Sequence, residues 1–218
     1  MGRLAASILS ADLARLAEQV KLIEAYADLI HIDIMDAHFV PQLTIGPAVV
    51  ASLRPHTDRA LHAHLQVEAP EGLFDELAEA GTDGVSFHLE AVGDPVPALR
   101  KGRDAGMRMG VAVAPWTPVD EVFPYLEELD DVIVLAVDPG RAGQPFRPET
   151  LRRLEAVRSE VDRRSPAAEV HVDGGVNLET GRRCIEAGAT VLTAASAIFG
   201  AEDPARAARE LKTLVGAA

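Results

Sequence analysis

The sequence predicts a single (β/α)8 barrel. Short apolar runs rich in β-branched residues alternate with longer amphipathic stretches from one end of the chain to the other. The apolar runs are continuous, as in ADLIHIDIM (27–35) and DDVIVLAV (130–137), which is typical of parallel strands covered on both faces. An open doubly wound sheet uses the same pattern, but eight units without a long crossover favour closure. The eight units use nearly all 218 residues, so we expect one domain over residues 1–218.

Each unit is expected to pair one strand with the helix that follows it. The apolar runs place the strands near residues 4–9, 28–34, 60–66, 84–89, 109–114, 131–137, 168–173 and 190–195. The amphipathic stretches place the helices near residues 12–26, 46–53, 71–80, 95–105, 119–128, 148–162, 178–187 and 203–215.

Capping residues support several of these helix boundaries. Ser10 and Asp12 precede the first helix, and Pro118 and Pro148 precede two later ones. Three helices are expected to end in a glycine that precedes a strand, as is typical of αβ loops: Ala80-Gly81, Ala105-Gly106 and Ala187-Gly188.

Composition excludes several classes of protein. With 21 Lys+Arg against 34 Asp+Glu, the formal net charge is −13, which argues against a nucleic-acid-binding face. No apolar run reaches the roughly 18 residues that a membrane span needs, and acidic residues stand where a signal peptide has none. The single cysteine, Cys184, cannot form an internal disulfide, so a reducing, cytoplasmic compartment is expected.

Polar residues stand at the ends of three predicted strands. Because side chains at i and i+2 share a face of a strand, His31, Asp33 and Met35 should point to one side. The same spacing pairs His62 with His64 and His171 with Asp173. In such barrels the chemistry lies at the carboxyl ends of the strands. Two imidazoles and two carboxylates from three strands could bind a divalent cation such as zinc, iron, manganese or cobalt. The alternative is that each histidine only satisfies a buried hydrogen bond.

Glycine-rich loops follow the later strands. The segment 138–146 (DPGRAGQPF) is expected to be a loop with glycine hinges, Gly174-Gly175 follows Asp173, and Ala195-Ser196 precedes a short apolar turn. Loops after strands seven and eight commonly bind phosphate through backbone N–H groups. The lysines Lys21, Lys101 and Lys212 all fall in predicted helices, which argues against a Schiff-base aldolase and against a decarboxylase of the orotidine-phosphate kind.

The chain resembles the ribulose-phosphate 3-epimerase family over essentially its whole length. The resemblance is carried by SILSAD (7–12), HIDIMDAHFVPQLTIGP (31–47), HLQV (64–67), VSFHLEA (85–91), VDPGRAGQPF (137–146), VDGGVN (172–177) and SAIFG (196–200). It implies a phosphate-binding barrel with one divalent metal and inversion at C3 of a ketose phosphate through a metal-stabilised cis-enediolate. Ribulose 5-phosphate and xylulose 5-phosphate are the expected pair, and the family suggests a homo-oligomer.

The resemblance also implies roles for individual residues. The implied metal ligands are His31, Asp33, His64 and Asp173, and the two aspartates are the implied acid and base. The implied substrate contacts are Ser7, Met35, Gly143, Gly174, Gly175, Ala195 and Ser196, where Ala195 replaces the family's usual glycine. Asp36 and His38 match the motif and are expected to support the site from behind the ligands.

Several positions depart from the family pattern. His62 replaces an acid, Gln66 and Leu135 replace methionines, and Ala37 replaces a glycine. The other departures are Ala114, Arg141, Ala142 and Ala195. Together they leave open a related substrate such as allulose 6-phosphate, whose epimerases have a similar VDPG-x-AGQPF loop. A barrel that binds a phosphorylated ligand without turnover is a further alternative.

Overall fold

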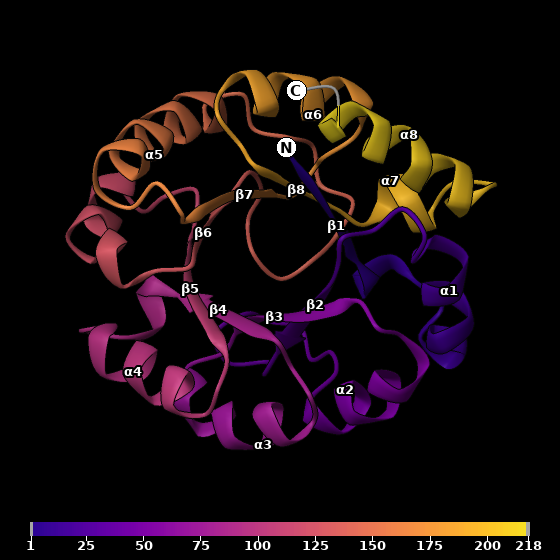
Figure 1. The fold of residues 1–218 in the computed structure, drawn as a ribbon, viewed down its shortest axis with the longest axis horizontal. Coiled ribbons are helices and arrows are strands. Elements are labelled where there is room, and N and C mark those ends of the chain that lie inside the picture. The colour runs from indigo at the N-terminus through magenta and orange to yellow at the C-terminus, as the bar shows by residue number, and fades with distance from the viewer. Residues whose placement is uncertain (1, 217–218) are drawn as a thin grey trace.

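A closed ring of parallel strands forms the centre of the molecule (Figure 1). The computed structural model describes residues 2–216. Every strand pairs with the next along the chain, and β1 pairs with β8 to close the barrel. The strands are β1 (Arg3–Ser7), β2 (Leu29–Met35), β3 (Ala60–Gln66), β4 (Gly84–His88), β5 (Arg108–Val113), β6 (Asp131–Leu135), β7 (Glu169–Asp173) and β8 (Val191–Ala194).

Helices cover the outside of this ring, as Figure 1 shows. They are α1 (Leu16–Ile23), α2 (Pro47–Leu53), α3 (Phe74–Glu79), α4 (Val96–Asp104), α5 (Thr150–Arg164), α6 (Leu178–Glu186), α7 (Ser196–Phe199) and α8 (Pro204–Gly216). The predicted barrel is therefore confirmed. The predicted single domain over 1–218 stays a prediction, since Met1, Ala217 and Ala218 lie outside the described residues. No helix among residues 2–216 has both the length and the apolar character needed to cross a membrane.

Several predicted elements differ from the structure at their ends or in helix type, and two of these differences have a clear local cause. Residues Val119–Glu128 form a run of 3-10 turns, η6, in place of the expected α-helix, because Pro124 inside the run has no N–H to donate. The first strand ends at Ser7 instead of residue 9, because the Ser7 hydroxyl accepts a hydrogen bond from the Leu9 N–H and starts the 3-10 turn Ile8–Ser10.

The main hydrophobic core lies between the strands and the helices. Outward-facing strand residues such as Ile32 and Val134 belong to this core together with helix residues such as Leu154 and Leu211. Cys184 of α6 is buried in this layer, and burial raises the pKa of its thiol to about 12.

The interior of the barrel is largely polar. Among residues 2–216, apolar side chains inside the ring form two small clusters, Ala5–Leu29–Val191 and Ala112–Ile133–Leu135. Imidazoles fill much of the remaining space: the ring centroids of His31 and His62 are 5.7 Å apart, and those of His62 and His171 are 5.5 Å apart. Polar residues that alternate with outward-facing apolar ones along the strands therefore meet inside the ring.

Candidate active site

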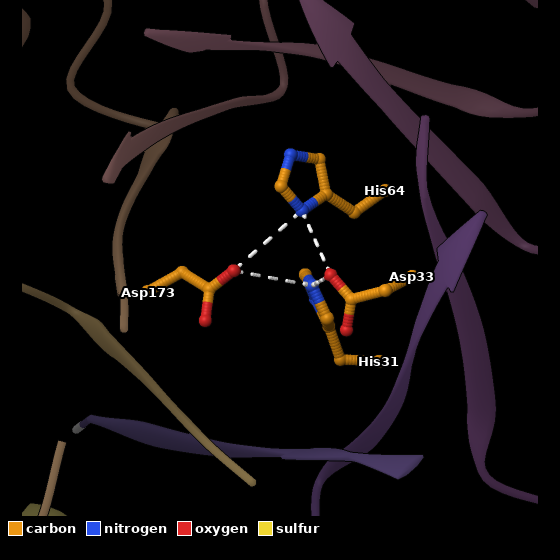
Figure 2. A group of neighbouring side chains, drawn as sticks. All are labelled: His31, Asp33, His64 and Asp173. Carbon is orange, nitrogen blue, oxygen red and sulfur yellow. Dashed lines mark hydrogen bonds and ion pairs between the residues drawn. The ribbon is translucent and has the colours of Figure 1, made fainter. Parts of the chain in front are cut away.

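Four polar side chains converge at the carboxyl ends of β2, β3 and β7 (Figure 2). One ligand atom from each of His31, Asp33, His64 and Asp173 lies within 4.8 Å of the others. The strand register places Asp33 directly beside His64, and the i, i+2 spacing keeps His31 on the same face as Asp33. The structure thus brings together the four residues that the sequence pointed to.

The contacts among these four side chains each join an imidazole nitrogen to a carboxylate oxygen. His64 Nδ1 lies 3.2 Å from Asp33 Oδ1 and 3.5 Å from Asp173 Oδ2. His31 Nε2 lies 3.4 Å from Asp33 Oδ1 and 3.6 Å from Asp173 Oδ2. Both histidines are fully buried and Asp33 is 4% exposed, whereas the Asp173 side chain is 18% exposed and faces the cleft. Two buried nitrogens and two carboxylates therefore face one common point.

A divalent cation fits this arrangement. Neither ring nitrogen of the buried His31 has a hydrogen-bond partner, and an unpaired buried imidazole is unfavourable. A cation at the common point would give His31 Nε2 a partner and would neutralise both carboxylates. Nitrogen and oxygen donors in this ratio suit zinc, iron, manganese and cobalt.

Contacts within the cluster shift the pKa values of Asp33 and His64. Burial by itself raises the pKa of the Asp33 carboxyl, but the charges of His31 and His64 and their polar contacts outweigh burial and lower that pKa well below its usual range. Burial by itself lowers the pKa of His64, but its contacts with Asp173 and Asp33 raise the pKa to about 9. Protonation of His64 therefore competes with the binding of a cation at this imidazole.

Two neighbours hold the Asp33 carboxylate in place. The Ser7 hydroxyl donates to Oδ2 at 2.7 Å, and the Gln66 side-chain amide donates to Oδ1 at 3.0 Å. The Thr44 hydroxyl donates to the Asp33 carbonyl at 2.7 Å and accepts from the Met35 N–H at 3.0 Å. Each oxygen of the carboxylate is thereby oriented by a separate strand.

A cleft opens beside the cluster. Asp33 and Asp173 line it, together with all seven residues expected to contact substrate: Ser7, Met35, Gly143, Gly174, Gly175, Ala195 and Ser196. The loop that follows β6 lines the same cleft with residues 138–144. In this loop the Gln144 side-chain amide donates to the carbonyls of Asp138 at 2.6 Å and Arg141 at 2.9 Å.

The two glycines after β7 are required by the backbone at this edge of the cleft. Gly174 has φ +102°, and a Cβ there would stand 2.4 Å from Val137 Cγ2. Gly175 has φ +65°, and a Cβ there would stand 2.7 Å from the Phe146 backbone nitrogen. Any side chain would strain the turn and push the loop after β6 away from it.

Comparison with known proteins agrees with this geometry. Residues 3–199 match the model of the ribulose-phosphate 3 epimerase family. This chain belongs to the ribulose-phosphate 3-epimerase family. It is 43% identical over 215 residues to the ribulose-phosphate 3-epimerase of Mycobacterium tuberculosis (strain ATCC 25618 / H37Rv), a match that covers 99% of this chain and 93% of the relative. It is 41% identical over 218 residues to the cytoplasmic isoform of ribulose-phosphate 3-epimerase from Oryza sativa subsp. japonica. That match covers 98% of this chain and 94% of the relative.

The barrel of this epimerase family member also matches solved structures. The structure of 3-hexulose-6-phosphate synthase from Salmonella typhimurium matches with a TM-score of 0.73 at 20% sequence identity. The match covers 99% of this chain and 99% of the synthase chain. At that identity the match supports the fold alone.

The structure corrects the list of departures around the cleft. Gln66, Leu135, Arg141 and Ala195 line the cleft, but His62 and Ala114 do not. His62 lies two residues before His64, so it stands nearer the amino-terminal end of the barrel, where its Nε2 is 3.0 Å from the Ser86 hydroxyl and 3.5 Å from Asp131 Oδ2. The change at His62 therefore concerns the barrel interior and leaves the cleft wall of this epimerase unchanged.

The motif residues Asp36 and His38 lie away from the four ligand candidates. His38 is exposed, and its Nδ1 contacts the Asp36 carbonyl at 2.8 Å. The Asp36 carboxylate accepts from the backbone N–H groups of His38, Phe39 and Glu68. Asp36 therefore shapes the loops after β2 and β3, which differs from the expected support behind the ligands.

Sequence reasoning missed two neighbours of the site, the buried His88 and the half-buried Glu90. His88, at the end of β4, is fully buried, and its Nε2 lies 3.2 Å from His64 Nε2. Glu90 lies 3.0 Å from His88 Nδ1. Both residues belong to the VSFHLEA segment (85–91), which contributed to the family resemblance. The sequence analysis assigned no role to His88 or Glu90.

Proposed function

We propose that this enzyme inverts the configuration at C3 of a ketose phosphate and interconverts D-ribulose 5-phosphate with D-xylulose 5-phosphate. The observation that carries the proposal is the pair of carboxylates, Asp33 and Asp173, placed at one cation-sized cluster on the wall of a cleft in a member of this epimerase family. The names of the relatives support the choice of substrate.

Asp33 and Asp173 suit the two proton transfers that epimerisation requires. They come from different strands and approach the cluster from different sides, as Figure 2 shows. One carboxylate accepts the C3 proton from one face, and the other, protonated beforehand, donates a proton to the opposite face. The chain and substrate end with the same number of protons, and the two carboxylates have exchanged roles, so the reverse reaction uses the same pair.

A divalent cation held by His31, Asp33, His64 and Asp173 would supply the Lewis-acid charge that stabilises negative charge on the C2 and C3 oxygens of the substrate. Hydrogen bonds from Ser7 and Gln66 orient the Asp33 carboxylate for proton transfer. Gly143, Gly174, Gly175, Ala195 and Ser196 are the proposed contacts of the phosphate end, and Met35 lines the cleft near Asp33. Backbone N–H groups can bind an anion there although the net charge of the chain is −13.

Removal of the metal tests this assignment. Dialysis against a chelator should abolish activity, because the negative charge formed on the substrate oxygens would lose its counter-charge, and addition of zinc, iron(II), manganese or cobalt should restore it. A metal-free preparation that remains fully active would contradict the proposal. Elemental analysis of the purified protein identifies the metal that is bound.

A second candidate substrate is favoured by the cleft wall. Gln66 and Leu135 replace apolar methionines of the family pattern, and Arg141 adds a charge on the exposed loop after β6. These changes suit a related sugar phosphate such as D-allulose 6-phosphate. A panel of kcat/KM values over pentulose and hexulose phosphates decides between the two. The first proposal expects ribulose 5-phosphate to lead, and a clear preference for a hexulose phosphate overturns it. No turnover of any sugar phosphate would favour a barrel that only binds one.

We also propose that the protein is cytoplasmic and forms a homo-oligomer. The rice relative is named as a cytoplasmic isoform, and the family resemblance suggests self-association. Light scattering on the protein as it elutes from a size-exclusion column measures the oligomeric state. A monomer at the protein concentration used in the activity assay contradicts that part of the proposal. Cell fractionation tests the compartment.

A further inference from the structure

His64 has a second nitrogen that the proposed metal site does not use. Its Nδ1 faces Asp33 and Asp173, whereas its Nε2 points away from the other three residues of the cluster, as Figure 2 shows. That Nε2 lies 3.2 Å from Nε2 of His88, and the two ring planes are only 22° apart. Two rings with nearly parallel planes that meet nitrogen to nitrogen at this distance share one proton in an N–H···N hydrogen bond.

Glu90 determines which ring donates that proton. Its Oε2 lies 3.0 Å from His88 Nδ1, and an ionised carboxylate can only accept a hydrogen bond. His88 Nδ1 must therefore carry the hydrogen, which leaves the Nε2 of a neutral His88 as an acceptor. The donor to that acceptor is His64 Nε2–H, so the lone pair of a neutral His64 lies on Nδ1.

The Glu90 carboxylate is itself held in the acceptor role. Its Oε1 accepts a hydrogen bond from the Ala114 N–H at 2.7 Å and another from the Thr117 hydroxyl. The guanidinium of Arg153 on α5 fixes this loop, because it donates to the Ala114 carbonyl at 2.6 Å and to the Thr117 carbonyl at 3.1 Å. The ring of Phe39 packs against that of His88, with ring centroids 4.8 Å apart.

We propose that Glu90 and His88 are positioning residues that hold His64 in the tautomer whose Nδ1 lone pair faces the metal. Glu90, His88 and His64 form a chain of hydrogen bonds, called the relay below. It runs from the Glu90 carboxylate through the imidazoles of His88 and His64 to the cluster. Metal-bound histidines commonly donate their other N–H to a carboxylate or carbonyl, and loss of that partner weakens metal binding about 10–100-fold. Here a second imidazole stands between the ligand and the carboxylate. This inference rests on the proposed metal site.

The substitution Glu90→Gln reverses the polarity of the relay. The carbonyl oxygen of the new side chain must face the two donors, Ala114 N–H and Thr117 hydroxyl, so its amide N–H group faces His88 Nδ1. His88 then carries its hydrogen on Nε2, where it meets the hydrogen of His64 Nε2. Either the contact between the rings breaks or His64 moves its proton to Nδ1 and loses the lone pair that binds the metal.

Zinc affinity, measured by competition with a chromophoric chelator, tests the relay. Glu90→Gln should bind Zn²⁺ about 10–100-fold more weakly than the unmodified protein. Glu169→Gln is the matched control: the Glu169 side chain is 20% exposed against 18% for Glu90, and its Oε2 also faces a histidine, His171. Glu169 begins β7, at the end of the strand opposite Asp173. Glu169→Gln should bind zinc with unchanged affinity.

Long-range ¹H–¹⁵N NMR of the zinc-loaded, unmodified protein gives a second test that needs no variant. His88 should carry its hydrogen on Nδ1, and His64 should carry its hydrogen on Nε2. Equal zinc affinity of Glu90→Gln and the unmodified protein, or a hydrogen on Nε2 of His88, overturns the relay. Failure of the unmodified protein to bind zinc, iron, manganese or cobalt overturns the metal site itself, and the relay with it.

Discussion

At the residue scale, burial of ionisable groups is the feature that most needs explanation. His31, Asp33 and His64 are almost wholly removed from water, and unpaired charges in such surroundings are unfavourable. Their contacts with one another and with Asp173 compensate in part, and a bound cation would complete the compensation. The i, i+2 spacing predicted that His31 shares a strand face with Asp33, and the family resemblance singled out the four residues of the cluster.

Ala37 is a residue whose backbone conflicts with its side chain. Among residues 2–216 it is the non-glycine residue with positive φ, at 60°, and it stands where the family usually has glycine. Ala37→Gly should therefore raise the free energy of unfolding by about 0.5–1 kcal/mol, the net of relieved strain and added chain entropy. Urea unfolding measures the change.

The control for that substitution is Ala51→Gly, on the exposed face of α2. Glycine at a helical position costs about 1 kcal/mol relative to alanine, so this variant should lose stability. Loss of stability in both variants would contradict the strain assigned to Ala37.

At the scale of elements, periodicity predicted the strands better than the turns between them. The eight predicted strands are present, with ends that differ by a few residues. The stretch 119–128 has helical periodicity, but Pro124 turned it into η6. The relay of His88 and Glu90 was beyond prediction because it depends on how β3 and β4 align side by side and on the loop at Ala114 and Thr117. The spacing of His88 and Glu90 in the sequence does not indicate that they contact His64 on β3 and the loop at Ala114 and Thr117.

The turn after β7 gives a prediction at this scale. Gly175→Ala should cost about 1–2 kcal/mol of stability, because φ is +65° and the new Cβ would press on the Phe146 backbone. Displacement of the loop after β6 should also raise KM several-fold while metal content stays unchanged. Steady-state kinetics and elemental analysis check both.

Gly93→Ala is the matched control for Gly175→Ala. A Cβ at Gly93 meets nothing within 4 Å, so stability and KM should hardly change. An unchanged KM in Gly175→Ala would contradict the assignment of this turn to the phosphate end of the cleft.

At the scale of the whole molecule, the amino-terminal rim of the barrel is tied by one carboxylate. Glu169 of β7 pairs with Arg3 of β1 at 2.8 Å and with Arg108 of β5 at 3.2 Å, and so joins strands that are not neighbours in the ring. The alternating pattern predicted the closed ring, but composition could not indicate this network, because charged residues on a rim look like ordinary surface.

The pKa of Glu169 gives this network a pH dependence. Burial raises that pKa, but contacts with His171 and Arg3 outweigh burial and lower it from 4.5 to about 2. A lowered folded-state pKa stabilises the protein above the unfolded-state pKa, and that stability is lost as pH falls from about 4.5 towards 2. Glu169→Gln should therefore destabilise the protein at pH 7, and the difference should shrink below about pH 4.5.

Urea unfolding across pH measures this difference. Glu155→Gln, at an exposed position on α5, is the control and should change stability little at any pH. A difference for Glu169→Gln that is constant with pH would contradict the role of its charge.

Solvent deuterium incorporation at C3 tests the central claim most directly. The unmodified, metal-loaded enzyme in D₂O should convert ribulose 5-phosphate into xylulose 5-phosphate that carries deuterium at C3, because the donating carboxylate exchanges its proton with solvent. Asp33→Asn and Asp173→Asn, assayed at saturating metal, should each lower the rate of incorporation by about 10²–10⁴-fold, since each removes one of the two proton-transfer groups. Incorporation that persists at the original rate in both variants would contradict the assignment of Asp33 and Asp173 as base and acid.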